Sequence, residues 1–255
     1  MSRSRHGGRH ELGQNFLHHR PTIDRIVALV TETEGDILEI GAGDGALTVP
    51  LARLGRELLA IELDEHRAAR LRRRLPSVQV RTGDALELPL DREVIVSNVP
   101  FHVTTPILRR LLDSDAWRVA VLLTQWEVAR KRAGVGGATM MTAQHAPWFE
   151  FALLGRVPAS AFRPMPSVDA GLLRIERRPQ PLVAPRERRR FEAFVRATFT
   201  GRGRGIGGVL AGMAGWSRNG VRRALDDAGI APGALPRDLA PEQWAALWSH
   251  ARDRR

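Results

Sequence analysis

Three polar side chains, Glu62, Asp84 and Asn98, each follow a short run of apolar residues. Taken singly, each has a simple structural explanation: an acid at a helix start, a helix N-cap and a turn residue. Taken together, they stand where successive strands of an α/β sheet would end, and such sheets bind ligands beyond the carboxyl ends of their strands. The pattern therefore favours one shared binding site.

The stretch Asn98-Val-Pro-Phe101 could hold a planar ring that carries an exocyclic NH₂ group. The side-chain carbonyl of Asn98 and the main-chain carbonyl of Val99, which precedes Pro100, can accept the two N–H bonds of the amine, while Phe101 stacks on the ring. Accepting both bonds favours a tetrahedral nitrogen whose lone pair can point at an electrophile. Catalysis would then come from positioning and polarisation, without a strong base.

A glycine-rich turn in the stretch Asp36–Thr48 provides a place for a nucleotide cofactor. An apolar run meets three glycines spaced two apart, which predicts a strand, a tight turn and the start of a helix. The pattern Gly41-x-Gly43-x-x-Ala46 also satisfies the dinucleotide fingerprint, and Glu62 lies 21 residues past Gly41, where a ribose-binding acid is expected. The turn alone therefore leaves the choice of cofactor open.

The elements that must position these residues alternate along the chain. Pro21 leads an amphipathic helix in which one face carries Ile23, Ile26, Val27 and Val30. Short apolar runs, each followed by polar or helix-like sequence, have the rhythm of a parallel sheet with crossover helices. These runs are Leu58–Ile61, Val78–Val80, Val94–Val96 and Val119–Leu123. The fold class is therefore α/β.

The pattern changes in the second half of the chain. Trp148–Val157 and Ala170–Arg177 can form two further strands at the sheet edge, around a proline-rich loop at 162–168. A second proline-rich break, at 178–185, precedes a segment with apolar residues at helical spacing: Phe191, Phe194, Val195, Leu225, Trp244, Leu247 and Trp248. We predict a catalytic domain at 1–182, with a basic tail at 1–10, and a helical domain at 183–255.

Composition indicates a nucleic-acid partner. The net charge of +11 attracts polyanions such as a phosphate backbone. Lys131 is the one lysine among 39 basic residues, so almost all of the positive charge is arginine, which pairs with phosphate and stacks on bases. Codon bias of a GC-rich genome is an alternative explanation for arginine in place of lysine, but it explains little of the excess of positive over negative charge. No run of about 18 apolar residues exists and cysteine is absent, so we expect neither membrane insertion nor secretion, and a reducing cytoplasm.

Several of these stretches resemble the rRNA adenine N6-methyltransferases, and within them the erythromycin-resistance (Erm) methyltransferases. The resemblance spans residues 11 to 178 and rests on Gly13-Gln-Asn-Phe-Leu17, Glu39-Ile-Gly-Ala-Gly-Asp-Gly45, Glu62-Leu-Asp64, Gly83-Asp-Ala85, Asn98-Val-Pro-Phe101 and Phe162-Arg-Pro-Met-Pro-Ser-Val168. The similarity to the Erm branch in particular rests on Gln125–Gly137, Pro147-Trp148 and Phe191–Phe199.

The resemblance implies a Rossmann-like class I methyltransferase sheet of seven strands that binds S-adenosylmethionine, with a small all-helical C-terminal domain. Glu62 would hold the ribose hydroxyls and Asp84 the cofactor adenine. The other expected cofactor contacts are Gln14, Asn15, Leu17, Glu39, Gly41, Gly43, Leu63, Ala85 and Asn98. No metal is expected, and S-adenosylhomocysteine would be the product.

The resemblance also implies the substrate. A single adenine in the peptidyl-transferase region of 23S rRNA would leave its stack and be held by Asn98, Val99, Pro100 and Phe101. The residues expected to contact RNA are Arg130, Lys131, Arg132 and Arg163. We expect a cytoplasmic monomer that acts on free or partly assembled 23S rRNA and confers resistance to macrolide, lincosamide and streptogramin B antibiotics.

Two departures from the family pattern and three alternatives accompany this interpretation. Phe101 stands where tyrosine is common, and 201–208 contains five glycines where relatives have a basic helix, at a cost of roughly 1 kcal/mol per helical glycine.

The main alternative is a housekeeping dimethyltransferase of small-subunit rRNA. A nicotinamide-dependent oxidoreductase would leave Asn98–Phe101 unexplained, and a non-catalytic RNA-binding protein would not need intact Glu62, Asp84 and Asn98.

Overall fold

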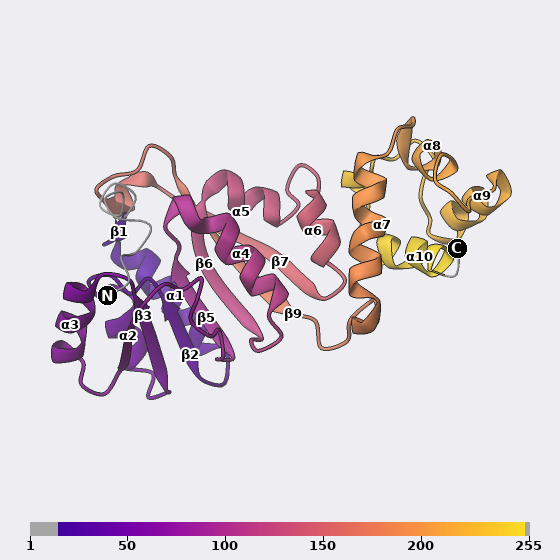
Figure 1. Ribbon diagram of the computed structural model, residues 1–255. Helices are drawn as coiled ribbons and strands as arrows, with labels where there is room; N and C mark the ends of the chain where they lie inside the picture. Colours follow the sequence, from indigo (N-terminus) through magenta and orange to yellow (C-terminus); the bar gives the residue numbers. More distant parts are fainter. Residues whose placement is uncertain (1–14, 253–255) are drawn as a thin grey trace, which may run out of the picture. The chain divides into compact units, whose positions relative to one another are not determined.

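The computed structural model describes residues 15–252, in which a seven-stranded sheet has the order β4-β3-β2-β5-β6-β9-β7 (Figure 1). The strands from β4 to β6 are parallel, and β9 runs antiparallel to β6. Their bounds are β2 (Ile37–Ile40), β3 (Leu58–Glu62), β4 (Gln79–Thr82), β5 (Val94–Asn98), β6 (Val119–Gln125), β7 (Phe149–Val157) and β9 (Ala170–Arg177). The predicted α/β class and the seven-stranded sheet are confirmed.

Helices connect these strands where the sequence supplies starts and ends for them. Pro21 lies in the first turn of α1 (Arg20–Thr31), where its missing N–H is not needed. Asp64 caps α3 (Glu65–Arg74) by accepting a hydrogen bond from the Arg67 amide at 3.0 Å. Arginines in the last turn of α3 suit the negative end of the helix dipole. The helices of this part are α1 (Arg20–Thr31), α2 (Thr48–Ala52), α3 (Glu65–Arg74), α4 (Thr104–Asp113) and α5 (Trp126–Arg132).

The parallel strands β2, β3, β5 and β6 are buried on both faces. Alternate residues, such as Val94 and Val96 of β5, pack in one core with Ile23, Ile26 and Val30 of α1. Such continuous apolar strands are typical of parallel sheets covered by helices on both sides. Ser97, a buried polar residue of β5, donates its hydroxyl hydrogen to the Ile40 carbonyl at 2.8 Å.

The chain divides into two compact units. One contains the chain up to Ala129 together with Ala152–Glu176, and the other contains Arg130–Phe151 and the chain from Arg177 onward. The second unit thus includes a segment that precedes the boundary predicted at residue 182. A division of catalysis and RNA binding at residue 182 stays a prediction.

The second unit is built around aromatic side chains. Phe191 of α7 contacts Trp148 and Trp248 edge-on, with ring centroids 5.5 and 5.9 Å apart, and Phe199 stacks on Trp244 at 5.9 Å. These contacts give a small helical unit a specific core. The apolar residues predicted from helical spacing are all buried. The helices are α6 (Met140–His145), α7 (Arg188–Thr200), α8 (Gly205–Ala211), α9 (Arg218–Asp227) and α10 (Pro241–Ala251).

In the glycine-rich segment 201–208, residues 201–204 form a bend and residues 205–208 form the beginning of α8. A Cβ on Gly203 would lie 2.4 Å from main-chain atoms of Gly208 and Val209. Gly205 has a φ of +65°, and a Cβ there would lie 2.5 Å from the Pro232 carbonyl oxygen. Glycine is needed here because backbone approaches backbone, which explains a composition that is unfavourable for an isolated helix.

One pairing was not predicted. Residues 162–168 were predicted to form a loop throughout, but Phe162–Arg163 form strand β8, which pairs antiparallel with β1 (Phe16–Leu17). The loop prediction is wrong for these two residues because a partner strand distant in sequence supplies their hydrogen bonds. Among residues 15–252, no helix is both long and apolar enough to cross a membrane.

Candidate functional site

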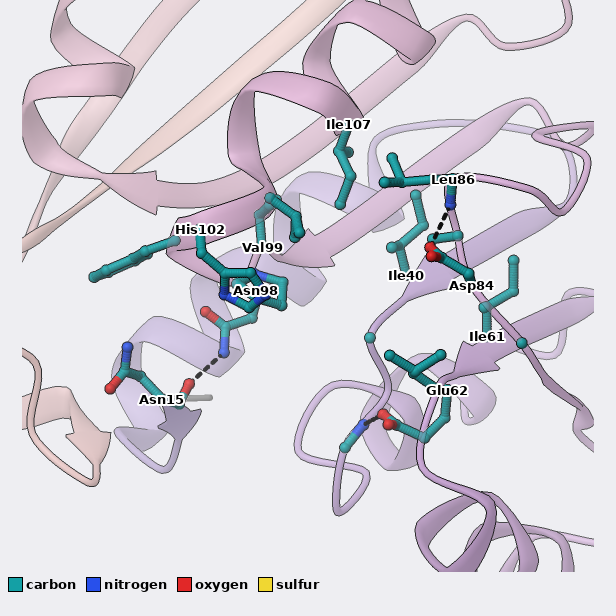
Figure 2. A pocket seen from close by; sticks show the side chains of 18 of the residues that line it. Asn15, Ile40, Ile61, Glu62, Asp84, Leu86, Asn98, Val99, His102 and Ile107 are labelled. Atoms are coloured by element: carbon teal, nitrogen blue, oxygen red, sulfur yellow. Dashed lines mark hydrogen bonds between the residues drawn. The ribbon is translucent and has the colours of Figure 1, made fainter. Parts of the chain in front are cut away.

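A pocket of about 180 Å³ lies at the carboxyl ends of β2, β3 and β5 and beside the loop after β4 (Figure 2). Figure 2 shows Glu62, Asp84 and Asn98 around this one pocket. Its apolar walls come from Ile40, Ile61, Leu86, Val99 and Ile107. The structure therefore brings together the three strand-end residues, as the sequence predicted.

Glu62 links two backbone segments and still has acceptor capacity. Its Oε2 accepts a hydrogen bond from the Gly43 amide at 2.6 Å and its Oε1 accepts one from the Asp64 amide at 2.9 Å. The residue is buried, so the carboxylate is held in one place. Each carboxylate oxygen has a second lone pair, and together the two can accept bonds from a pair of neighbouring hydroxyls, as in ribose.

Asp84 provides a second acceptor on the same pocket. Its Oδ1 accepts a hydrogen bond from the Leu86 amide at 2.8 Å, which fixes the side chain in an Asx turn. Asp84 is not a helix N-cap, because no helix follows it. Leu63, which is half exposed, and Ala85 also line the pocket. An acceptor beside apolar walls suits a planar base that carries an amine.

The glycine turn adopts the backbone conformations that glycine favours. Gly41 and Gly43 have φ values of +74° and +55°. A Cβ on Gly43 would lie 3.2 Å from the ring of Phe16, so the turn approaches this ring closely. The Arg67 guanidinium lies 4.2 Å from the centre of the Phe16 ring and bonds Asp44 at 3.0 Å. Phe16 is thereby held as a wall of the site.

Glu39 lines an adjoining cavity, which shares Phe16, Gly41, Gly43 and Asn98 with the first. Burial raises the pKa of Glu39 to about 8; Thr48 opposes this effect and the nearby Glu62 adds to it. Within the part of the chain that the structure describes, its Oε2 has no hydrogen-bond partner. A buried carboxylate oxygen without a partner is costly, and a cationic group such as an ammonium would satisfy it. Leu17 lines this second cavity rather than the first.

Asn98 is oriented by the main chain of Asn15. Its Nδ2 donates a hydrogen bond to the Asn15 carbonyl oxygen at 2.8 Å (Figure 2). Because a carbonyl oxygen can only accept, this contact identifies the nitrogen end of the carboxamide. The Oδ1 atom is therefore the end that is available as an acceptor for an amine.

The rest of the turn after β5 adds an acceptor and a ring. The Pro100 carbonyl accepts a hydrogen bond from the Val103 amide at 3.0 Å, whereas no such bond to the Val99 carbonyl forms among residues 15–252. Phe101 and His102 also line the first pocket. Asn98, Val99 and Phe101 thus line one pocket, and their role in holding an amine stays a prediction.

Sequence reasoning missed part of the site. Phe16 and His102 were not singled out, although Phe16 lies within the stretch that carried the family resemblance. The role of the Asn15 carbonyl in orienting Asn98 has no sequence signal, since every residue has a carbonyl. Gln14 lies outside the described residues.

The predicted RNA contacts fall in both units. Arg132 donates to the Thr139 hydroxyl oxygen at 2.7 Å and Arg130 to the Val135 carbonyl at 3.5 Å, so both support local structure. Lys131 of α5 and Arg163 of β8 are exposed. A role of these four side chains in binding RNA stays a prediction.

Comparisons with known proteins identify the family. The family model described as "Ribosomal RNA adenine dimethylase" matches residues 5–252. An rRNA adenine N-6-methyltransferase of Corynebacterium diphtheriae is 54% identical over 80% of this chain and 82% of its own length. The mycinamicin-resistance protein MyrB of Micromonospora griseorubida is 47% identical over 97% of this chain and 80% of its own length. The crystal structure of the 23S rRNA methyltransferase ErmE matches with a TM-score of 0.84 and 34% identity, over 94% of this chain and 100% of that chain. The chain therefore belongs to the ribosomal RNA adenine dimethylase family and is an rRNA (adenine-N6)-methyltransferase.

Proposed function

We propose that this enzyme uses S-adenosylmethionine to methylate N6 of one adenine in the peptidyl-transferase region of 23S rRNA, and that the methyl group confers macrolide, lincosamide and streptogramin B resistance. The observation that carries the chemistry is the hydrogen bond from Asn98 to the Asn15 carbonyl, which leaves Oδ1 as an acceptor beside a nucleoside-sized pocket. The choice of 23S rRNA is supported by the name of the 23S rRNA methyltransferase ErmE, and the resistance by the name of the mycinamicin-resistance protein MyrB.

The carboxylates that line the two cavities fit S-adenosylmethionine. Glu62 would hold the ribose hydroxyls and Asp84 the adenine amine, between the walls formed by Leu63 and Ala85. The unpaired Oε2 of Glu39, in the cavity beside the glycine turn, would take the ammonium of the methionine end. When bound, the cofactor supplies a methyl group on a positively charged sulfur, which the neighbouring carbonyl and aromatic groups favour.

The residues of this chain prepare the target amine. A flipped adenine would stack on Phe101, while the Asn98 side chain and the Val99 carbonyl accept its two N–H bonds. This arrangement directs the nitrogen lone pair away from both acceptors and toward the cofactor side of the pocket. Binding geometry lowers the barrier, so the site does not need a residue that removes a proton before attack.

The substrate is expected to be free or partly assembled 23S rRNA. An enzyme that must extract a base from deep in the large subunit is excluded sterically by the finished particle. The enzyme should therefore methylate naked 23S rRNA much faster than mature ribosomes. Equal rates on both substrates would contradict this step.

Calorimetry tests the cofactor assignment directly. S-adenosylhomocysteine should bind with micromolar affinity, nicotinamide nucleotides should not bind, and Asp84→Ala should weaken binding because it removes the acceptor for the adenine amine. Tighter binding of NADH, or an unchanged affinity in Asp84→Ala, would show that the cofactor site has been assigned wrongly.

The housekeeping alternative, a dimethyltransferase of small-subunit rRNA, shares the same chemistry. It would place the product methyl groups on small-subunit rRNA and would not protect cells from macrolides. The location of the modified base therefore separates the two functions.

A further inference from the structure

A third cavity lies at the carboxyl end of β6, the strand next to the one that carries Asn98. Its volume is about 440 Å³, and its lining includes Gln125, Trp126 and Arg156. Asn98 is in register with Leu123 of β6, and Gln125 lies two residues further along. Neighbouring strands lie ~4.8 Å apart and rise ~3.3 Å per residue, so the Cα atoms of Asn98 and Gln125 are about 8 Å apart. This distance is roughly twice the axial rise of one stacked nucleotide.

The ring of Trp126 is held rigidly in this cavity. The Arg156 guanidinium lies 5.2 Å from the ring centre and is itself fixed by Asp169 at 2.7 Å. Asp169 also accepts a hydrogen bond from the Ala159 amide at 2.8 Å, and its carbonyl accepts one from the Trp126 amide at 2.9 Å. The cavity therefore has a preorganised aromatic and cationic wall.

A glycine keeps α5 close to β9. A Cβ on Gly171 would lie 2.5 Å from the Ala129 Cβ and 3.4 Å from Cε3 of Trp126. This close approach places Trp126, the first residue of α5, at the edge of the sheet, where its ring is partly exposed. Packing alone would not require an arginine on this ring or an open space beside it.

The cavity, whose lining also includes the carboxylates of Glu127 and Asp169, offers two uncharged polar groups that can read a base edge. Gln125 has both a donor and an acceptor, the Ser167 hydroxyl has both as well, and Val168 presents an exposed apolar side chain. An aromatic ring, an arginine and a side-chain amide are the groups with which proteins bind unstacked bases of single-stranded RNA. The excess positive charge of the chain also favours a polyanionic ligand.

We propose that this cavity, the Trp126 pocket, binds an unpaired base that neighbours the target adenine in the rRNA. The proposal rests on rRNA adenine methylation by this enzyme, and it holds for either choice of rRNA. Holding one neighbour of the flipped adenine would fix the strand on one side of the extruded nucleotide. Trp126 would thereby help to select which adenine enters the Asn98 site.

The test uses the full-length enzyme and the shortest rRNA fragment that it methylates. An abasic nucleotide is introduced at each position flanking the target, one at a time, and KM for RNA and kcat are measured with wild type and Trp126→Ala. In wild type, one abasic position should raise KM about tenfold. Trp126→Ala should raise KM on the intact RNA by a similar factor, and that abasic position should then have no further effect, since the two changes remove the same contact.

Two variants keep the test informative if Trp126→Ala folds poorly. Trp126→Phe keeps an aromatic face and should retain most of the affinity and the sensitivity to the abasic position. Arg156→Gln leaves the ring in place and should reduce the abasic penalty several-fold. Trp216→Ala, which changes a tryptophan of the other unit, should leave the penalty unchanged.

The proposal would be overturned if Trp126→Ala and every abasic position raised KM for RNA independently, so that the two factors simply multiplied. So would a loss of kcat or of cofactor affinity in Trp126→Ala with no change in KM for RNA, since that result indicates a packing role. Failure of the wild-type enzyme to methylate any rRNA fragment would instead refute the activity itself, and that result is seen before any variant is made.

Discussion

The carboxamide of Asn98 donates a hydrogen bond to the main-chain carbonyl of Asn15 at 2.8 Å. Asn15 is in turn the residue before β1, whose Phe16 pairs with Arg163 of β8. The orientation of the key acceptor is therefore set by a short strand near the beginning of the chain and by a strand more than a hundred residues away in sequence. Local sequence around Asn98 alone does not determine it.

Asn98→Ala should abolish methyl transfer and leave cofactor binding largely intact. The change removes one acceptor for the target amine, but it removes none of the carboxylates that hold the cofactor. Rates are measured with labelled S-adenosylmethionine, and affinity for S-adenosylhomocysteine is measured by calorimetry. Turnover above one tenth of the wild-type rate would show that the Asn98 carboxamide is not the acceptor that prepares the amine.

Phe101→Ala should weaken capture of the flipped base and keep some activity. Loss of base–aromatic stacking costs ~1–3 kcal/mol, so KM for RNA should rise by roughly 5- to 150-fold. Phe101→Tyr is the matched control, because it retains the ring and restores the hydroxyl common in the family. The stacking assignment fails if Phe101→Ala and Phe101→Tyr have the same KM.

Cofactor affinity should increase with pH between 5.5 and 7.5. Burial raises the pKa of Glu39 to about 8, so the free protein carries this carboxyl mainly in its protonated form at pH 7. A bound ammonium favours the ionised form and lowers that pKa, so binding releases a proton and tightens as pH approaches 8. The range stays below the titration of an α-amino group near about 7.7–8.0.

Glu39→Gln supplies the control for this pH effect. Glutamine has nearly the same size and does not titrate, so the affinity of the variant should be flat over the same pH range. Calorimetry in two buffers with different ionisation enthalpies reports the released proton in wild type. An equal pH slope in both proteins would assign the effect to another group.

RNA binding should depend steeply on salt, and Lys131 should account for part of the slope. Each phosphate that is neutralised adds about 0.7–0.9 to the slope of log K against log salt. Lys131→Ala should remove one such increment without lowering the melting temperature, because the side chain is exposed. Arg132→Ala should also destabilise the fold, since it breaks the bond to Thr139.

Arg53→Ala removes the same charge from an exposed position in the other unit. If it lowers the slope as much as Lys131→Ala does, the effect is one of net charge, and α5 is not a specific RNA contact. Binding that is insensitive to salt would remove the nucleic-acid argument from the basic composition.

Most of the sheet was predictable because its strands are continuous apolar runs. The strand predicted at Ala170–Arg177 has those bounds in the structure, and the run Val94–Val96 extends only to Asn98. The convergence of Glu62, Asp84 and Asn98 followed from the rule that parallel strands end at one edge of the sheet. The spacing of these residues along the chain and the periodicity of the apolar runs are enough to predict both features.

The missing parts depend on contacts between distant segments. Two-residue strands such as Phe16–Leu17 show no alternation, so their pairing with Phe162–Arg163 leaves no periodic signal. The raised pKa of Glu39 and its unpaired Oε2 depend on what surrounds the side chain in three dimensions, whereas the residue type alone predicts an ordinary ionised acid. Helix propensity makes glycine unfavourable at 201–208, whereas Gly203 and Gly205 are needed for close backbone packing.

The most direct test of the central claim is to map the methylated base. The enzyme is incubated with labelled S-adenosylmethionine and, in parallel, with deproteinised 23S rRNA and small-subunit rRNA, and the modified nucleotide is located by primer extension and mass spectrometry. We predict N6-methylated adenine at a single position in the peptidyl-transferase region of 23S rRNA. Methylation found only on small-subunit rRNA would contradict the account and assign the housekeeping function instead.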